Sequence, residues 1–159
     1  MRNRYVKPLV GVELGVFHAE NALDMLRYLP MKKLFLVDPY LPYVDGDGAV
    51  WNNSDTDFQI AQKNLEGYSQ CEFIRKSSVD AADELPDDLD FVYIDANHNY
   101  EPALADMATY YPKVRVGGVL GGHDFYSDYQ GVIFAAVDFS RRVGAKLFVE
   151  SPDWWIVKG

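Results

Sequence analysis

Short apolar segments alternate along this chain with segments of helical periodicity, and this alternation constrains the fold more than any other feature. Each apolar segment has the length and the branched or aromatic content of a buried strand. Strands that alternate with helices are typical of an open, mostly parallel sheet with helices on both faces. Five such units occur, and their strands are expected at residues 9–16, 33–38, 71–76, 89–95 and 116–124.

The end of the chain departs from this alternation. Residues 145–150 and 153–158 form two further strand-like segments, and only Ser151 and Pro152 separate them. A connection of this length requires an antiparallel hairpin, because parallel strands need a long crossover. We therefore expect an α/β fold whose mostly parallel sheet ends in an antiparallel C-terminal hairpin. No repeat or linker divides the sequence, which predicts a single domain over residues 1–159.

The chain is acidic, with a formal net charge of −9 over 159 residues. An acidic surface repels phosphate backbones, so a nucleic-acid partner is not expected. No apolar run approaches the roughly 18 residues that a membrane-spanning helix needs, and Glu13 interrupts the apolar run near the start. We therefore expect a cytoplasmic protein without a membrane partner. Cys71 is the single cysteine of the chain, which excludes an internal disulfide.

Polar side chains gather at the carboxyl ends of the expected strands, where open α/β sheets bind their ligands. The stretch "DFVYIDANHNYE" leaves its strand at Asp95 and continues through Asn97 and His98. The stretch "GGVLGGHDF" ends in a similar way at His123 and Asp124. Two of the three histidines in the chain therefore lie at the expected binding edge of the sheet.

Asp95, His123 and Asp124 would bring two carboxylates and an imidazole to one place. Carboxylates that converge in this way repel each other unless a positive group joins them, and a divalent metal ion would do so. Oxygen ligands favour Mg²⁺ or Mn²⁺, and a histidine shifts the preference towards Mn²⁺, Fe²⁺ or Zn²⁺. The alternative is that Asp95 contacts only an organic ligand, while His123 and Asp124 are polar lining.

His98 is a candidate general base, because an imidazole titrates near neutral pH and can take a proton from a substrate hydroxyl. Asn97, one residue earlier, would orient the substrate or accept a hydrogen bond from it. The alternative is that His98 is a loop histidine with a structural partner.

The first two strands end near Gly15 and Asp38. An acidic residue about 20 residues after a glycine turn holds ribose hydroxyls in nucleotide-binding folds. The G-x-G-x-x-G pattern of a dinucleotide site is absent, which argues against an NAD-type oxidoreductase and favours an adenosine-type ligand without phosphates. Ser77 and Ser78 follow the third strand, where one is expected to cap the next helix and the other could contact an adenine edge.

Four segments of the chain resemble class I S-adenosylmethionine (SAM)-dependent methyltransferases: "VELGVFHAENA", "LFLVDPYLPY", "DFVYIDANHNYEPALADMATYYPKVRVGGVLGGHDF" and "DWWIVK". The resemblance is greatest to a small bacterial type with the motifs I-D-[GA]-[ND]-H-x-Y-E and G-G-x-x-x-G-H-D, and it covers nearly the whole chain. It implies a Rossmann-like, seven-stranded methyltransferase sheet with an antiparallel last strand. It also implies a cofactor site that includes Asp95.

The resemblance assigns roles around that cofactor. The methionine part would lie against Glu13, Gly15 and Phe17. Its carboxylate would face Asn21. The ribose would be bound by Asp38, and the adenine would lie near Ser78.

The block around the fourth and fifth strands also resembles the metal-dependent catechol-type O-methyltransferases. Asp95 matches a metal-binding aspartate of those enzymes, and His123 and Asp124 match their Asp-Asn metal pair. His98 falls where they carry a catalytic lysine. The chain departs from the catechol pattern at two of the three metal positions and at the base. It also lacks the N-terminal helices that help to cover the active site in those enzymes, so a second copy of the chain is a candidate partner.

These features together predict O-methylation of a small hydroxylated acceptor, a sugar or another polar metabolite. A metal ion, Mg²⁺ or Mn²⁺, would hold the acceptor, and His98 would take its proton. The acceptor is expected to contact the segments 39–55 and 125–131. The alternative is a non-catalytic protein that binds SAM or its product S-adenosylhomocysteine (SAH) on a methyltransferase-like fold.

Overall fold

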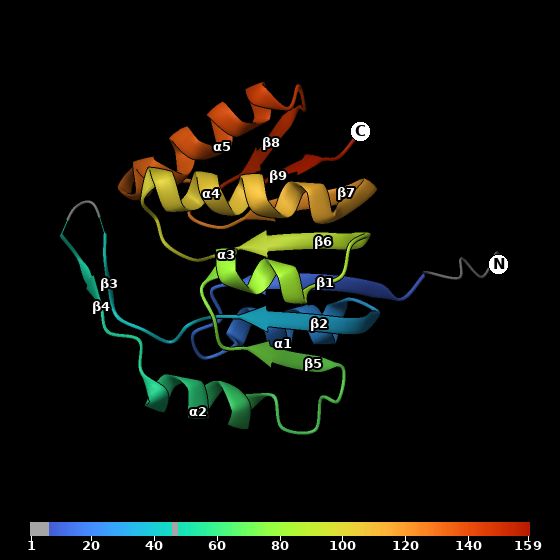
Figure 1. Cartoon of the computed structure of the whole chain (residues 1–159), viewed down its shortest axis with the longest axis vertical. Coiled ribbons are helices and arrows are strands. Elements are labelled where there is room, and N and C mark those ends of the chain that lie inside the picture. Colours follow the sequence, from blue (N-terminus) through green and yellow to red (C-terminus); the bar gives the residue numbers. More distant parts are fainter. Residues whose placement is uncertain (1–6, 46–47) are drawn as a thin grey trace.

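The computed structural model describes residues 7–45 and 48–159 as a central sheet flanked by helices (Figure 1). Seven strands form this sheet, and their bounds are β1 Leu9–Leu14, β2 Met31–Val37, β5 Cys71–Ile74, β6 Leu89–Ile94, β7 Val114–Gly122, β8 Leu147–Glu150 and β9 Asp153–Val157. Their order across the sheet is β5-β2-β1-β6-β7-β9-β8.

Every pair of neighbours from β5 to β7 is parallel, whereas β9 is antiparallel to both β7 and β8. This confirms the mostly parallel sheet and the antiparallel C-terminal hairpin that the sequence predicts. β1 ends at Leu14, two residues before the expected end, because Gly15 has a φ of 82° and turns the chain out of the sheet.

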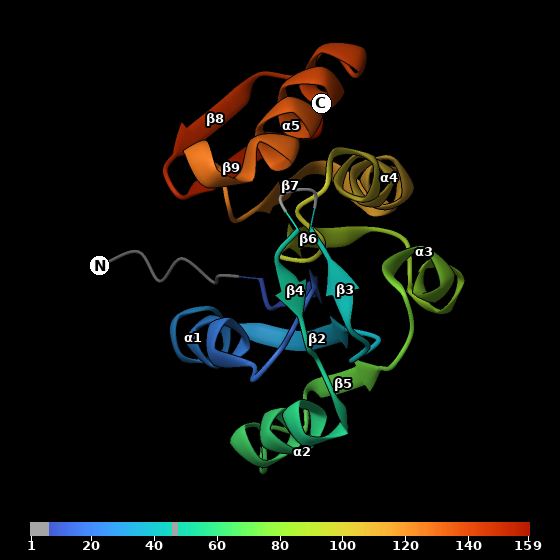
Figure 2. The ribbon, with the colours of Figure 1, turned by 90° about the vertical axis from the view of Figure 1, so that its left-hand side faces the viewer.

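Helices cover both faces of the sheet (Figure 2). Their bounds are α1 Glu20–Tyr28, α2 Asp55–Asn64, α3 Ser78–Ala81, α4 Tyr100–Tyr110 and α5 Gln130–Arg142, with short 3-10 turns at Ala82–Glu84, Tyr111–Lys113 and Ser127–Tyr129. One buried cluster joins α3, α4 and α5 to the sheet, and a second joins α1 and α2 to it. This agrees with the helices that the sequence predicts on the two faces.

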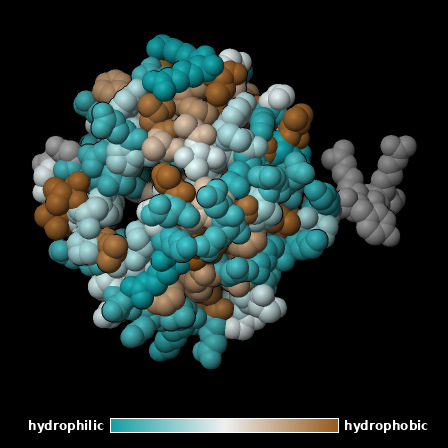
Figure 3. All heavy atoms as spheres, in the orientation of Figure 1, coloured by the Kyte–Doolittle hydropathy of each residue, from teal (hydrophilic) through white to brown (hydrophobic). Residues whose placement is uncertain are grey.

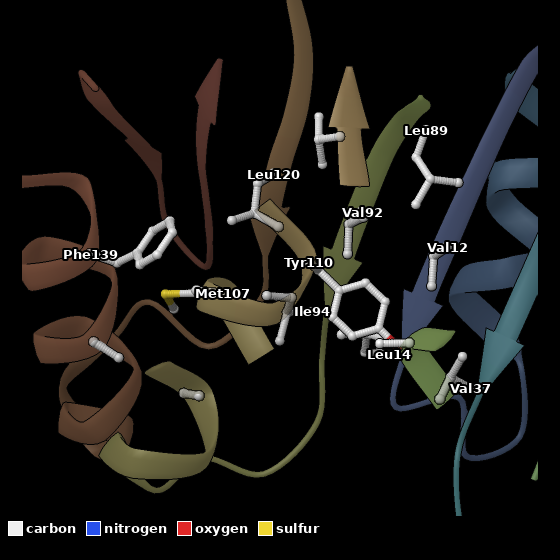
Figure 4. Close-up of a cluster of buried hydrophobic side chains, with 14 of the residues drawn as sticks. Val12, Leu14, Val37, Leu89, Val92, Ile94, Met107, Tyr110, Leu120 and Phe139 are labelled. Atoms are coloured by element: carbon white, nitrogen blue, oxygen red, sulfur yellow. The ribbon is translucent and has the colours of Figure 1, made fainter. Parts of the chain in front are cut away.

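The larger buried cluster holds α4 and α5 against the centre of the sheet (Figure 4). Met107 and Tyr110 of α4, Phe139 of α5, and Val92 and Ile94 of β6 all belong to this cluster. Burial of large apolar side chains contributes about 1.5–3 kcal/mol each, so this cluster holds the carboxyl end of β6 against α4. The loop between them carries Asp95, Asn97 and His98.

The segment 39–55 is rich in Pro, Gly, Asn and Asp, a composition that predicts a polar loop, but the structure shows two strands in it. Two short strands, β3 Tyr43–Val44 and β4 Val50–Trp51, pair antiparallel and form a hairpin. The hairpin stands beyond the carboxyl ends of the sheet strands (Figures 1 and 2). Two-residue strands carry too little periodicity to be recognised in a sequence. Val44 and Val50 are more than half exposed, and apolar side chains gather at this edge of the surface (Figure 3).

The strand order reverses between β1 and β6, since the chain runs from β1 outward to β5 and then returns to β6. Such a switch point opens a crevice at the carboxyl ends of the strands. Among the described residues, no helix is both long and apolar enough to cross a membrane.

Candidate functional site

A cavity of about 630 Å³ opens at this switch point. Its size is within the range of small-molecule sites. The structure brings every residue that the sequence predicts as a cofactor, catalytic or metal residue to the lining of this one cavity: Glu13, Gly15, Phe17, Asn21, Asp38, Ser78, Asp95, Asn97, His98, His123 and Asp124. The hairpin contributes Tyr43 and Trp51 to the same lining.

The turn after β1 requires glycine at position 15. A Cβ atom on Gly15 would lie 1.8 Å from the backbone oxygen of Asp95, which no side chain can tolerate. Phe17 and Ala19 follow with φ angles of 46° and 66°, a conformation that is costly for residues with a side chain. The chain therefore passes very close to the end of β6 and leaves an open space above the turn.

Asp38 holds this turn in place from the end of β2. Its Oδ2 accepts hydrogen bonds from the backbone N–H groups of Val16 (2.9 Å) and Phe17 (3.1 Å), and its Oδ1 accepts one from Tyr40 (2.7 Å). The side chain is only 3% exposed. Asp38 thus has a structural role, and ribose binding would use the lone pairs that these three bonds leave.

Glu13 places a buried carboxyl group beneath the same turn, with 1% of the residue exposed. Its Oε1 accepts a hydrogen bond from Nδ2 of Asn21 (2.8 Å), and its Oε2 makes none with the described part of the chain. Burial raises the pKa of Glu13 to about 8, and the charges of Asp95 and Asp38 add to the effect while the Asn21 bond opposes it. A positively charged ligand group would satisfy this carboxyl.

His98 lies between two carboxylates at the other end of the cavity. Its Nδ1 is 2.9 Å from Oδ2 of Asp45, and its Nε2 is 2.9 Å from Oδ2 of Asp124. Burial alone would lower the pKa of His98, but the bonds to Asp124 and Asp45 outweigh it and raise that pKa. A neutral imidazole has a single N–H, so two such contacts favour the imidazolium, which donates from both nitrogens.

This arrangement differs from the expectation that His98 is a free general base. An imidazolium that donates from both nitrogens has no lone pair with which to take a proton. Burial would favour the neutral acid of Asp124, but the bonds from His98 and His123 hold its pKa below the ordinary value. His98 in this state is a fixed positive charge that orients Asp124.

Asp45 is a site residue that the sequence does not reveal. It is 5% exposed, and its Oδ2 accepts hydrogen bonds from both His98 and Nε1 of Trp51 (2.6 Å). It follows β3, so the hairpin carries it across to a loop 53 residues away in sequence. In the sequence it lies in "VDGDG", which reads as an ordinary turn, and no local signal places it at the site.

Aromatic rings enclose the same histidine. The ring of His98 stacks on Tyr129 with centroids 4.0 Å apart and meets the edges of Trp51 and Tyr43 at 5.4 and 6.4 Å. Rings stacked on an imidazolium add a cation–π attraction. Asn97, expected to orient a substrate, accepts a hydrogen bond from the backbone of Asn99 and so shapes the loop.

Within residues 7–45 and 48–159, one set of three groups could share a metal ion: Asp95, His98 and Asp124, each with a ligand atom within 4.8 Å of the others. His98 takes the place that the sequence assigns to His123. His123 instead directs Nδ1 to Oδ1 of Asp124 (2.9 Å) and leaves about a third of its side chain exposed. Burial and the neighbouring charge of Asp124 raise the pKa of Asp95. A cation would relieve this repulsion, so the donor set fits a divalent metal once His98 gives up a proton.

The two serines after β5 divide the roles that the sequence leaves open. Ser77 caps α3 by accepting a hydrogen bond from the backbone N–H of Asp80 (3.2 Å). Ser78 lines the cavity and donates a hydrogen bond to Oδ1 of Asp106, a buried residue of α4. Asp106 occupies one position in a helical pattern, and nothing local in the sequence distinguishes it from a surface aspartate.

Among proteins of known sequence, residues 11–125 match a family described as a methyltransferase domain. Uncharacterized protein R132 of Acanthamoeba polyphaga mimivirus is 29% identical over 127 residues, which cover 77% of this chain and 53% of that protein. The chain therefore spans about half the length of this curated relative.

Solved structures share the fold at low sequence identity. The O-methyltransferase NovP superposes with a TM-score of 0.69 at 19% identity, over 95% of this chain and 72% of NovP. The MycE methyltransferase of the mycinamycin pathway, solved with Mg, SAH and mycinamycin VI, has a TM-score of 0.64 at 15% identity, over 96% of this chain and 45% of MycE. The family match covers more than half of the sequence, and the seven-stranded sheet agrees with it. The chain belongs to the methyltransferase domain family.

Proposed function

We propose that this protein transfers the methyl group of SAM to a hydroxyl oxygen of a small acceptor, a sugar or another polar metabolite. The observation that carries the proposal is the single cavity that joins two different ends. One end has the unpaired Oε2 of Glu13 beside a glycine turn, and the other has Asp95, His98 and Asp124. Methyl transfer needs a cofactor and an acceptor oxygen held in line within one space.

The β1–β2 end of the cavity suits SAM. The ammonium of its methionine part would donate to the unpaired Oε2 of Glu13, and its carboxylate would lie near Asn21. The ribose would reach the remaining lone pairs of Asp38. The SAH in the MycE structure supports a cofactor of this kind on the same fold.

The hairpin end suits an acceptor with several hydroxyl groups. Tyr43, Trp51 and Tyr126 offer apolar ring faces there, and Asp95 and Asp124 offer carboxylate oxygens. Ring faces beside a few fixed hydrogen-bond acceptors are the composition of sites that orient small polar molecules. The NovP and MycE structures, both of methyltransferases, support an assignment within this class of chemistry.

A divalent metal, Mg²⁺ or Mn²⁺, would be held by Asp95, His98 and Asp124, and it would supply Lewis acidity that lowers the pKa of an acceptor hydroxyl. The side chains of the chain would align the hydroxyl and receive its proton. Asp95 and Asp124 have lone pairs for this. In the absence of the ion, His98 would position Asp124 through their shared hydrogen bond, whereas with the ion bound its Nε2 would be a ligand and would no longer donate to Asp124. Asp45 would in turn fix the other nitrogen of His98.

The test is acceptor-dependent formation of SAH from SAM, measured by mass spectrometry with a panel of sugars, phenols and hydroxy acids. Each acceptor is assayed with EDTA and then with Mg²⁺ or Mn²⁺. SAH that forms only with a hydroxylated acceptor would support the proposal, and Asp124→Asn should abolish that signal. SAH formation with amines or thiols alone would overturn the assignment to oxygen.

A second candidate is a protein that binds SAM or SAH without catalysis. The observation in its favour is that both nitrogens of His98 are engaged, so this histidine offers no free base. It predicts SAH binding without turnover for every acceptor and either metal.

A further inference from the structure

The outer strand β8 forms an open edge of the sheet. It is the last strand in the order β5-β2-β1-β6-β7-β9-β8, and within residues 7–45 and 48–159 it pairs with β9 alone. It lies at the opposite end of the fold from α2 (Figure 1). An open edge offers backbone donors and acceptors to another strand, and natural proteins usually block such edges. The backbone and side chains of β8 therefore decide which partner this edge accepts.

The backbone of β8 presents two residues to the open edge. A two-residue connection joins Glu150 to its partner Asp153, so this closing pair exchanges backbone hydrogen bonds within the hairpin. Hydrogen-bonded pairs alternate along an antiparallel ladder, so the N–H and C=O groups of Leu147 and Val149 point away from β9. No backbone hydrogen bond from elsewhere in the described chain reaches these groups. The edge thus offers two donors and two acceptors to an added strand.

Opposite charges flank the same stretch. Lys146 directly precedes β8 and Glu150 ends it, and both residues are exposed. Each lies two residues from Phe148, so all three side chains share one face of the strand. Suppose that a second copy of β8 runs antiparallel about a two-fold axis at Phe148. Lys146 of each copy then faces Glu150 of the other, and Leu147 faces Val149 in a hydrogen-bonded pair.

The neighbouring two-fold registers lack this agreement. An axis at Val149 would set Lys146 opposite Pro152, and an axis at Leu147 would set Lys146 opposite Phe148. Neither register brings the two opposite charges together. Charged side chains at a strand edge oppose most pairings, and here they favour one register over its neighbours.

Aromatic rings lie on the same face as the two charges. Phe148 stacks on Trp155 of β9 with ring centroids 5.6 Å apart, and Nζ of Lys146 lies 4.6 Å from the centroid of the Phe148 ring. Neither Phe148 nor Trp155 belongs to the two buried clusters that join the helices to the sheet. In the register centred on Phe148, this residue and its copy form a non-hydrogen-bonded pair, in which side chains come closest. The two stacks would then meet across the contact.

We propose that two copies of this chain associate through β8, antiparallel and centred on Phe148, so that their sheets become continuous. Three separate features agree with this one register: the outward backbone groups of Leu147 and Val149, the charges of Lys146 and Glu150, and the ring of Phe148. The contact is symmetric and therefore closes as a dimer. It is small, so we expect a dimer that forms reversibly at micromolar concentration. The proposal is independent of methyl transfer, because no residue of β8 lines the cavity.

The experiment is sedimentation velocity of wild type from low micromolar to submillimolar concentration, with two charge-reversal variants. Lys146→Glu and Glu150→Lys should each weaken the dimer by about 10-fold, because each sets like charges opposite each other twice. An equimolar mixture of the two variants should associate about as tightly as wild type, because every facing pair in the mixed dimer is again one lysine and one glutamate. Lys63→Glu, at an exposed position of α2, is the control and should associate like wild type.

Each other outcome counts against the proposal. Wild type that stays monomeric throughout would overturn it, and so would a dimer that both variants leave unchanged. A mixture that associates no better than the separate variants would exclude the register centred on Phe148. Val149→Pro is an independent variant, because an edge strand tolerates proline where the N–H points outward. It removes one donor of the contact and should also weaken the dimer, while circular dichroism checks that each variant is folded.

Discussion

The two ends of the cavity are built from different kinds of interaction. At the β1–β2 end, Asp38 accepts hydrogen bonds from three backbone N–H groups, so the chain path itself is fixed. At the β6–β7 end, the two nitrogens of the His98 ring contact the side chains of Asp45 and Asp124. The first end is therefore tied by hydrogen bonds to the end of β2, whereas the second depends on where the hairpin lies.

This difference agrees with the roles that we propose for the two ends. A preformed site suits a cofactor that is the same in every reaction cycle. A hairpin that carries Asp45 and Trp51 suits an acceptor site that closes around its ligand. Disturbing the first end should change folding or cofactor affinity. Disturbing the second should change turnover and leave cofactor affinity nearly intact.

The largest expected effect is that of Gly15→Ala at the rigid end. The new methyl group would overlap the backbone of β6, and φ of 82° would add strain, so the free energy of unfolding should fall by about 3 kcal/mol or more. Urea denaturation measures this. Gly67→Ala is the matched control, because Gly67 also has a positive φ but has nothing within 4 Å of a new Cβ. Equal losses in the two variants would contradict the close approach at Gly15.

His98→Ala tests the side-chain-held end. Turnover should fall by about 100-fold, because Asp124 would lose the imidazolium that orients it. The Kd for SAH should change by less than about twofold. Turnover assays and calorimetry measure the two quantities. His123→Ala should lower turnover much less, because His123 does not belong to the set of three residues whose ligand atoms lie within 4.8 Å of one another. An equal loss of SAH affinity in His98→Ala would place His98 in the cofactor site instead.

Glu13 gives the rigid end a pH dependence. Its carboxyl has a pKa of about 8 in the folded protein, so below that pH it must lose a proton before it can pair with the ammonium of SAH. The affinity should therefore rise by about 10-fold or more from pH 6 to 8 and level off above pH 8. In Glu13→Gln the side chain at position 13 does not ionise, so only SAH itself titrates and the affinity should not show this rise. If the SAH affinity of wild type depends on pH in the same way as that of Glu13→Gln, the ammonium of SAH does not contact Glu13.

The same carboxyl should make folding sensitive to pH. Because the pKa of Glu13 is raised from 4.5 to about 8 on folding, the folded protein holds a proton that the unfolded chain releases in that range. The contribution of Glu13 to stability is therefore present below about pH 4.5 and is lost as the pH rises towards 8. The difference between wild type and Glu13→Gln in urea denaturation should follow this direction.

The smallest effect is expected for Trp51→Phe in the hairpin. The variant keeps the ring against His98 but removes the hydrogen bond from Nε1 to Asp45, which is worth about 1 kcal/mol. Turnover should fall by roughly threefold without a change in SAH affinity. Unchanged turnover would show that the hairpin bond does not hold the catalytic end.

The site residues that directly follow sheet strands could be predicted from the sequence, whereas those brought in by the hairpin or by a helix could not. Gly15, Asp38 and Asp95 follow strands, and parallel strands bring their carboxyl ends to one edge, so strand periodicity alone places them together. Asp45 reaches the site through a non-local hairpin, and Asp106 through the rotation of a helix, and neither leaves a local pattern. The exchange of His98 for His123 has a similar cause, because the loop after β6 and the turn after β7 set the reach of each imidazole.

The most direct test of the central claim is calorimetric titration of wild type with SAM, first with EDTA and then with Mg²⁺ or Mn²⁺. We expect micromolar binding in all three conditions, because Glu13 and Asp38 form the cofactor end without the cluster around His98. Binding that requires the metal would contradict the independence of the two ends. No binding in any condition would contradict the methyltransferase function itself.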